Sequence, residues 1–282
     1  MRYSNLLPPT WKKQVEDWLR EDLPSLDIGG FVVGEEETQA RLLGKSSGVL
    51  AGVPFFSEVF ALLDCQVEWL VEEGDTFSPG TTLALVSGPV RNVLMGERLA
   101  LNILARASGV ATQAREILAL IHEYGYNGRV AGTRKTTPGF RLVEKYSLVV
   151  GGLDTHRMDL SSLVMLKDNH IDSMGSITNA VEKSRTVASV WVKVEVECRS
   201  LEDAEEALEA GADIVMLDNF SPDRLKEVAA VLKRNYPSSI IEASGGITTA
   251  DLWEYFSPDV DVISLGSLTT AYPLIDCSLK VI

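Results

Sequence analysis

The stretch from residue 131 to residue 171 concentrates side chains that could bind an anionic small molecule. The whole chain has a formal net charge of −14. This stretch nevertheless gathers cations and two of the three histidines, namely Arg134, Lys135, Arg141, Lys145, Arg157, Lys167, His156 and His170. Arginine offers a planar fork of donors and lysine a compact charge, so phosphates and carboxylates are the expected ligands.

Polar residues also stand where successive apolar, strand-like runs end. They are Arg134, Lys167, Glu197, Asp218, Ser244-Gly245-Gly246, and Ser264 with Gly266. In a parallel β/α barrel, the carboxyl ends of all strands open on one face, where such enzymes carry out chemistry. A second interpretation stays open, in which the two cations simply pair with the two carboxylates in a buried ring of salt bridges.

The residue types suggest separate tasks at this face. Glu197 and Asp218 offer only oxygen, which suits Mg²⁺ held mainly through the phosphates of a substrate. Ser244-Gly245-Gly246 precedes a helix expected to begin near Thr248, and Gly266 follows one strand later. Glycines let a phosphate approach the backbone, and a helix N-terminus supplies unpaired N–H groups. These features predict a phosphate site at the two late strands.

The pair His156-Arg157 predicts a second binding region beside the phosphate site. Together with Arg134, Lys135 and Lys167 it would form a cationic pocket for a small polycarboxylate. A single histidine is more often structural, but the polar neighbours of His156 favour a ligand role. We expect His170, by contrast, only to cap the segment that begins after Lys167.

From residue 128 onward, strand-like and helix-like segments alternate. This alternation is typical of βα units with a parallel sheet and outer helices. About six strands can be distinguished, fewer than the eight of a complete barrel. Because side chains alternate along a strand, Lys193 and Glu195 should share the orientation of Glu197, deeper in the barrel.

The first half of the chain has a different pattern. Residues 9–20 predict a short helix with Trp11, Val15, Trp18 and Leu19 on one face. Residues 30–90, including FVVG and VLAGVPF, predict a small half-open sheet domain. Residues 92–124 predict helix with a break at Ser108-Gly109. Arg98 lies in this helix among apolar neighbours, where an arginine is usually a solvated charge.

Composition limits the classes of function. A sequence pI near 4.7 argues against nucleic acid as a partner, because no basic stripe could neutralise phosphates along a duplex. The three cysteines are widely spaced, which predicts free thiols in a reducing compartment. No apolar run reaches the roughly 20 residues of a membrane span, and the N-terminus lacks a signal-peptide core. We therefore expect a cytoplasmic enzyme with no membrane partner.

The segments RKTTPGFRLVEKY, THR and MLKDNH, in this order and spacing, resemble the quinolinate phosphoribosyltransferase family, in particular its fungal and other eukaryotic members. The resemblance extends over nearly the whole chain. It implies an incomplete α/β barrel over residues 113–269 and an N-terminal α+β sandwich domain over residues 1–112, to which residues 270–282 return. It also implies a pentosyltransferase that uses quinolinate, 5-phosphoribosyl-1-pyrophosphate and Mg²⁺ in NAD biosynthesis.

The same resemblance assigns roles to individual residues. Lys167, Glu197 and Asp218 would be catalytic, and the two carboxylates would also lie near the metal. Arg98 matches an arginine that family members insert into the site of a neighbouring subunit, which implies a homodimer or larger oligomer. Thr270 stands where many members have histidine. The implied substrate contacts are Arg98, Thr133, Arg134, Lys135, His156, Arg157, Lys167, Glu197, Asp218, Ser244, Gly245, Gly246, Ser264 and Gly266.

Two other functions stay open at this point. A barrel aldolase could use Lys167 or Lys193 to form a Schiff base, which requires a desolvated lysine. A carrier or sensor of NAD metabolites could also be built on the same fold. The dense arginine and histidine cluster favours an anion site over the first alternative, and turnover would exclude the second.

Overall fold

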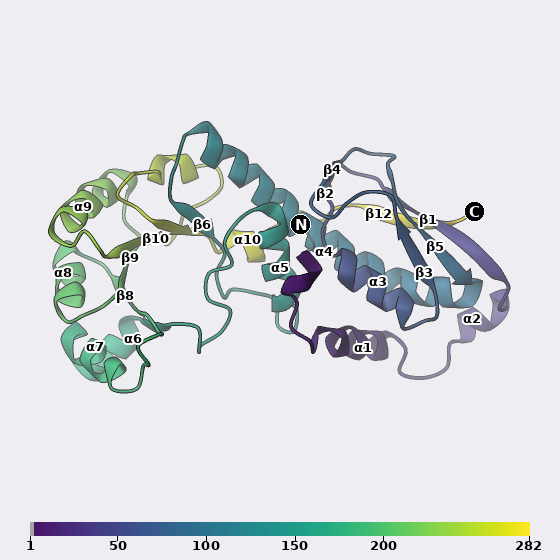
Figure 1. Cartoon of the computed structure of the whole chain (residues 1–282), viewed down its shortest axis with the longest axis horizontal. Coiled ribbons are helices and arrows are strands. Elements are labelled where there is room, and N and C mark those ends of the chain that lie inside the picture. Colours follow the sequence, from purple (N-terminus) through teal and green to yellow (C-terminus); the bar gives the residue numbers. More distant parts are fainter. Residues whose placement is uncertain (1–2) are drawn as a thin grey trace. The chain divides into compact units, whose positions relative to one another are not determined.

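The computed structural model describes residues 3–282, which divide into two compact units (Figure 1). Within the described residues, unit 1 comprises 3–116, 137–152 and 271–282, and unit 2 comprises 117–136 and 153–270. None of the helices between residues 3 and 282 is long and apolar enough to cross a membrane.

Unit 1 contains an antiparallel sheet in the order β12-β1-β5-β3. In β1, Ala40 and Leu42 are fully buried, and they pair with Val86 and Ala84 of β5. The last strand, β12, pairs with the first, so the C-terminal segment completes this sheet. The strands of unit 1 are β1 (Glu37–Gly44), β2 (Gly48–Val49), β3 (Gln66–Trp69), β4 (Thr76–Phe77), β5 (Thr82–Pro89) and β12 (Cys277–Val281).

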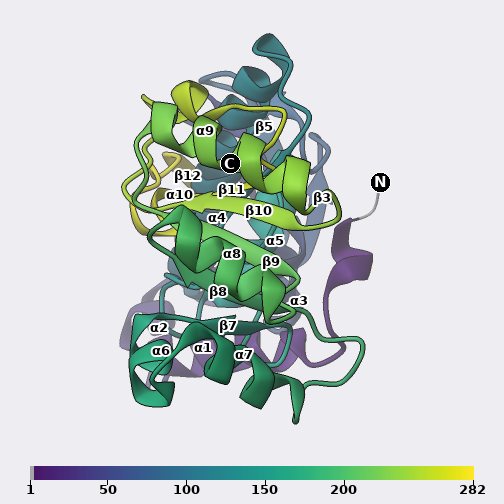
Figure 2. The same ribbon diagram turned by 90° about the vertical axis from the view of Figure 1, so that its left-hand side faces the viewer.

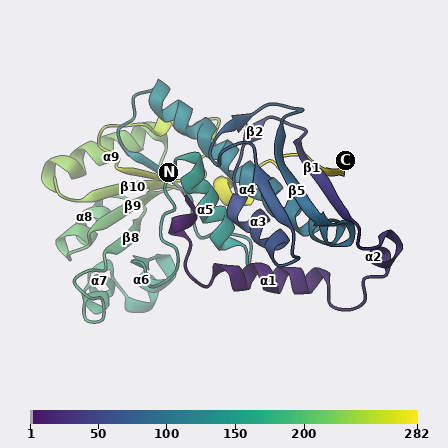
Figure 3. The same ribbon diagram turned by 45° about the vertical axis from the view of Figure 1, so that its right-hand side comes forward.

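Helices cover one side of this sheet, and α3 lies beside β3 and β5 in Figure 3. Helix α1 packs Trp11, Val15, Trp18 and Leu19 against the core, as its spacing predicts. The ring centroids of Trp11 and Phe55 are 5.3 Å apart. The helices are η1 (Tyr3–Leu6), α1 (Trp11–Asp22), α2 (Ile28–Val33), α3 (Val53–Ala61), α5 (Arg141–Gly151) and most of α4 (Val90–Glu123).

Two apolar segments for which the sequence predicts β-strand are helical in the structure. FVVG belongs largely to α2, which begins where the Asp27 side chain accepts a hydrogen bond from the backbone of Gly30. VPF opens α3, where Pro54 occupies the first turn and Phe55, Phe56, Val59 and Phe60 bury one face. Apolar runs this short suit a buried helix and a buried strand equally well, and tertiary packing decides between them.

The expected break at Ser108-Gly109 is wrong, because α4 continues through both residues. The Ser108 hydroxyl bonds the backbone N–H and C=O of Ala51, so its polarity is used by a neighbouring segment. A Cβ on Gly109 would collide with the carbonyl oxygen of Pro273. The glycine therefore permits close packing within the helix and does not end it.

Unit 2 is a parallel sheet of six strands in the order β6-β11-β10-β9-β8-β7. The end strands β6 and β7 are not paired with each other, so the barrel is incomplete, as expected. The strands are β6 (Arg129–Ala131), β7 (Val164–Leu166), β8 (Val194–Cys198), β9 (Ile214–Asp218), β10 (Ile240–Ser244) and β11 (Val262–Ser264).

The helices of unit 2 cover the outer face of this sheet. Figure 2 shows α8 and α9 in front of β8, β9 and β10. Ser176 and Ser200 begin α7 and α8 by accepting backbone hydrogen bonds, a common N-cap arrangement. The helices are α6 (Asp168–Met174), α7 (Ile177–Arg185), α8 (Leu201–Glu209), α9 (Pro222–Asn235), η2 (Leu252–Tyr255) and α10 (Ser267–Thr270).

The α-helix expected near Thr248 is absent from its place in unit 2. Residues 245–248 form bends and irregular backbone, a turn occupies residues 249–251, and only the short 3₁₀-helix η2 follows. The turn is closed by Asp251, which accepts hydrogen bonds from the backbone and hydroxyl of Thr248, both at 2.7 Å. The backbone N–H groups after β10 therefore belong to a turn, and no α-helix dipole adds to them.

Candidate active site

The polar strand ends of unit 2 meet around one pocket of about 330 Å³. They meet because parallel strands carry their carboxyl ends to the same edge of the sheet. The pocket takes in nearly all of the strand-end residues singled out in the sequence. Its lining is Thr133, Arg134, Lys135, His156, Arg157, Met165, Lys167, Met216, Asp218, Glu242, Ser244, Gly245, Gly246, Ile247, Ser264 and Gly266.

Arginines form one wall of the pocket. The Nε atom of Arg134 is buried and has no hydrogen-bond partner within the protein. Arg157 donates from Nη2 to the sulfur of Met165 at 3.3 Å and from Nη1 to the carbonyl of Leu163 at 3.4 Å. Burial and the charge of Arg134 lower the pKa of the Arg157 guanidinium, while Glu195 and Glu242 oppose this shift. An anionic ligand would satisfy both arginines.

Lys167, Glu197 and Asp218 lie together at the strand ends. Lys167 directly follows β7 and forms an ion pair with Glu197 of β8. Asp218 ends β9 and accepts a hydrogen bond from the Asn219 amide at 2.5 Å. Burial and the neighbouring charge of Glu197 raise the pKa of the Asp218 carboxyl. Part of the salt-bridge interpretation is thus correct for Lys167 and Glu197, whereas Arg134 makes no such pair within the described residues 3–282.

Glycines shape the opposite end of the pocket. Gly245 has a φ of +91°, and a Cβ there would clash with the backbone nitrogen of Asn219. Gly266 leaves room for the side chain of Lys135, whose Nζ would lie 3.6 Å from an added Cβ. Thr269 also holds this segment by donating to the carbonyl of Lys135 at 2.8 Å. A cation therefore lies against an open backbone, an arrangement suited to a phosphate.

The two histidines of the cationic stretch have different environments. His170 accepts a hydrogen bond from the backbone of Lys167 at 3.1 Å, which confirms its expected capping role. His156 lines the pocket, but its side chain is only 10% exposed and its Nε2 lies 3.0 Å from Glu242. Both ring nitrogens of His156 are bonded within the protein, so a direct ligand role for it stays a prediction.

Sequence reasoning missed Glu242, Met165 and Met216. Glu242 lies two residues before Ser244, inside β10, whereas the predicted site residues are those at the ends of strands. The alternation that groups Glu195 with Glu197 would equally have grouped Glu242 with Ser244. Glu195 is fully buried, and burial together with the charge of Glu242 raises the pKa of its carboxyl.

Arg98 lies outside unit 2. It is an exposed residue of α4 within unit 1. Its part in substrate binding depends on the resemblance described above and stays a prediction.

Comparisons with known proteins identify the family of this chain. The model of the quinolinate phosphoribosyl transferase C-terminal domain matches residues 110–280, and that of the N-terminal domain matches residues 26–108. The chain belongs to the quinolinate phosphoribosyltransferase family. The two family domains together span most of the sequence, so the membership applies to both units.

Individual members of the family are similar along their whole length. The nicotinate-nucleotide pyrophosphorylase (carboxylating) of Dictyostelium discoideum is 51% identical, over 100% of this chain and 99% of that protein. The human protein of the same name is 52% identical, over 98% of this chain and 93% of its own. The crystal structure of the Francisella tularensis enzyme has a TM-score of 0.90 at 33% identity and covers 98% of both chains.

Proposed function

We propose that this protein joins quinolinate to 5-phosphoribosyl-1-pyrophosphate, giving nicotinate mononucleotide, pyrophosphate and CO₂ in NAD biosynthesis. The observation that carries this proposal is the composition of the pocket at the strand ends of unit 2. One wall presents arginines to carboxylates, the other end presents glycine turns and Lys135 to a phosphate, and carboxylates lie between them. Quinolinate has two carboxylates and the ribosyl donor is highly anionic, so each wall has a matching group.

The carboxylates Glu197 and Asp218 would act on the ribosyl carbon. Pyrophosphate leaves with the bonding electrons and the carbon becomes oxocarbenium-like, so negative charge nearby stabilises the transition state. The pyridine nitrogen then forms the new bond and becomes positively charged. When the adjacent carboxylate departs as CO₂, its bonding electrons stay on the ring carbon as a carbanion that the neighbouring positive nitrogen stabilises, and this carbon then takes up a proton. Lys167, Arg134 and Arg157 would hold the acceptor in line for this attack.

We also propose a magnesium requirement. The neighbouring carboxylates Glu197 and Asp218 fit a hard cation, since burial and the charge of Glu197 raise the pKa of Asp218 and a cation would relieve the repulsion between the two. They would bind Mg²⁺ largely through the phosphates of the donor, and the ion would neutralise charge on the departing pyrophosphate. Free Cys65, Cys198 and Cys277 support a reducing compartment, and we propose the cytoplasm.

The first test is product formation from quinolinate and 5-phosphoribosyl-1-pyrophosphate, with and without Mg²⁺. Nicotinic acid serves as the matched control acceptor, because it lacks the carboxylate that leaves. The expected result is that CO₂ and nicotinate mononucleotide form when quinolinate is the acceptor and Mg²⁺ is present. No product should form with nicotinic acid as the acceptor or without Mg²⁺. Turnover of nicotinic acid in place of quinolinate would contradict the proposal that quinolinate is the acceptor. Covalent trapping of a carbonyl substrate on the protein by borohydride would favour the aldolase alternative.

Shared sites between subunits are a separate proposal. If Arg98 completes the pocket of a partner, Arg98→Ala and Lys167→Ala should each be inactive alone. Mixing them after subunit exchange should restore about a quarter of wild-type activity, because half of random dimers are mixed and each has one intact site. No recovery, with exchange verified by size and labelling, would mean that Arg98 acts within its own subunit.

A further inference from the structure

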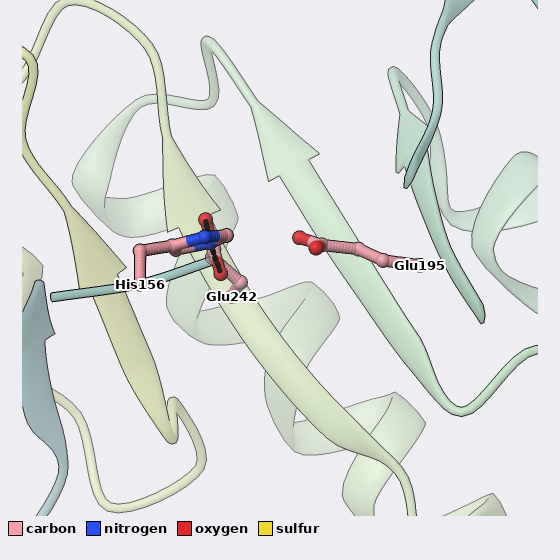
Figure 4. Close-up of side chains that lie close together, drawn as sticks. All are labelled: His156, Glu195 and Glu242. Carbon is pink, nitrogen blue, oxygen red and sulfur yellow. Dashed lines mark hydrogen bonds and ion pairs between the residues drawn. The ribbon is translucent and has the colours of Figure 1, made fainter. Parts of the chain in front are cut away.

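His156, Glu195 and Glu242 form a buried cluster beneath the pocket (Figure 4). His156 comes from the loop after α5, Glu195 from β8 and Glu242 from β10. Their nearest polar atoms lie within 4.8 Å of one another, a spacing that could suit a cation. Both oxygens of Glu195 are buried without a hydrogen-bond partner.

Hydrogen bonding around His156 argues against a metal at its ring. The backbone N–H of Arg157 donates to Nδ1 at 2.7 Å. A backbone nitrogen can only donate, so Nδ1 must carry a lone pair and the ring proton must reside on Nε2. A nitrogen that carries a proton has no lone pair for a metal. Nε2 instead donates to the two oxygens of Glu242, at 3.0 and 3.3 Å.

Glu242 is the acceptor that stabilises this tautomer and holds the ring in place. Its side chain is 3% exposed, and it also accepts a hydrogen bond from the Ser264 hydroxyl at 2.7 Å. With Ser264 on one side and His156 on the other, the carboxylate has little freedom to turn away. Neutral imidazole has one donor and one acceptor nitrogen, and here the carboxylate and the backbone determine which is which.

The His156 backbone needs this support. Its φ is +56°, a conformation that costs a residue other than glycine about 1 kcal/mol or more. The two bonds of the ring, one to Glu242 and one to the next residue, compensate for that cost. Arg157 follows directly, and its guanidinium extends along Met165 and Leu163 into the pocket wall. The direction of Arg157 therefore depends on the ring of His156.

We propose that Glu242 is a positioning residue for the acceptor. Its buried carboxylate holds His156 as the Nε2–H tautomer and thereby sets the place of Arg157, which binds a carboxylate of the aromatic acceptor. This inference extends the proposed function and depends on it for the identity of the acceptor. It assigns Glu242 no contact with the phosphoribosyl donor, whose phosphate lies at the glycine end of the pocket.

Three matched variants separate positioning from charge. Glu242→Leu removes the acceptor of the histidine bond, and KM for quinolinate should rise about 10- to 100-fold, the effect of misplacing a contact. Glu242→Gln keeps one acceptor oxygen and should stay within about threefold of wild type. Glu195→Gln removes the neighbouring buried carboxylate, which makes no hydrogen bond to His156, and should also stay within about threefold.

The same kinetics contain the outcomes that would overturn the proposal. In Glu242→Leu, KM for the ribosyl donor should rise less than KM for quinolinate, because the proposal assigns Arg157 to the acceptor. Equal rises for both substrates in Glu242→Leu would indicate general damage to the barrel. Adding Glu242→Leu to His156→Ala should cost nothing further if Glu242 acts through the ring, and additive losses would contradict that.

The tautomer can be measured without any variant that risks misfolding. The protein has three histidines, so a ¹⁵N spectrum of the imidazoles is simple, and His156→Asn assigns the signal. The expected result is an Nε2–H tautomer for His156 in the wild-type protein, retained in Glu242→Gln. An Nδ1–H or doubly protonated ring would overturn the proposal. Failure of quinolinate turnover would instead remove the proposed function while the tautomer still stood.

Discussion

Both units bury carboxylates, but they treat them differently. In unit 1, Glu73 accepts from the backbone of Gly52 and Val53 and from the Tyr146 hydroxyl. Glu144 accepts from the backbone and hydroxyl of Thr137 and from Tyr272. In unit 2, Glu195 is fully buried and neither of its oxygens has a hydrogen-bond partner, whereas the buried Glu242 beside it accepts from His156 and Ser264. Unit 1 uses these carboxylates to tie segments together, and unit 2 leaves one of its buried carboxylates unsatisfied.

This difference indicates where the molecule is built for stability and where for binding. A buried polar group without a partner costs free energy, so it persists only where another requirement maintains it. Unit 2 has one such group at the pocket, the Nε of Arg134, and another in Glu195, which lies next to the pocket residue Glu242. Departures from local consistency are expected at functional sites. The contrast between the units can be tested by matched substitutions.

The largest effect should come from Lys167, at the rim of the pocket. Lys167→Met removes a cation that the acceptor needs and leaves Glu197 unpaired, so kcat/KM should fall about 1,000-fold. The free energy of unfolding should change by less than about 1 kcal/mol, since the lysine is 45% exposed. Lys193→Met, at an exposed position before β8, is the control and should keep full activity. Loss of activity in the control alone would favour the aldolase reading.

Next in size is the loss of a satisfied carboxylate in unit 1. In Glu144→Gln, an amide NH₂ group replaces one of the two oxygens that accept from the backbone N–H and the hydroxyl of Thr137. Two donors then face each other and one hydrogen bond is lost. The free energy of unfolding should fall by about 2–3 kcal/mol in urea denaturation. Exposed Glu123→Gln should change it by less than about 0.5 kcal/mol. A cost no greater than that of the control would mean the Glu144 network is not stabilising.

The same substitution in unit 2 should have the opposite sign. Glu195→Gln replaces a buried, unpartnered carboxylate by a neutral amide, so the free energy of unfolding should rise by about 1 kcal/mol. Urea denaturation in parallel with Glu144→Gln measures both. A loss as large as that of Glu144→Gln would remove the distinction between the units.

The smallest effect concerns pH and Glu73. Burial raises the pKa of the Glu73 carboxyl, and its hydrogen bonds to Tyr146, Val53 and Gly52 partly oppose that shift. A raised folded-state pKa adds stability that is complete below the ordinary value and is lost as pH rises through the shifted value. Relative to Glu73→Gln, the wild type should therefore lose stability from about pH 4 to neutral pH. A gain over that interval would show that the hydrogen bonds outweigh burial.

Much of the fold followed from local pattern. The apolar face of α1 and the six strands of unit 2 could be predicted because apolar residues recur at regular spacing along them. The break at Ser108-Gly109 was wrong because Gly109 is required by Pro273, which lies far away in the sequence. The helix after Gly246 was wrong because Asp251 closes a turn there. Each error arose where a contact with another segment overrode the local signal.

The candidate site divides in the same way. The rule for parallel strand ends predicts from the sequence alone that Arg134, Lys167 and Asp218 lie close together, and all three line one pocket. Glu242 could not be found by that rule, because it lies inside its strand and its partner His156 is 86 residues earlier. Contacts of such separation leave no mark on local composition.

The sequence by itself determined the family, the parallel unit and the cationic pocket, because these depend on residue types at fixed spacing along strands. Tertiary structure alone decided which charged groups form ion pairs, which buried polar atoms lack a partner and which ring nitrogen of His156 carries the proton. Those properties depend on distances of a few ångströms between segments that folding brings together. Electrostatic and hydrogen-bond energies vary steeply over such distances, so they are settled only when the chain is folded.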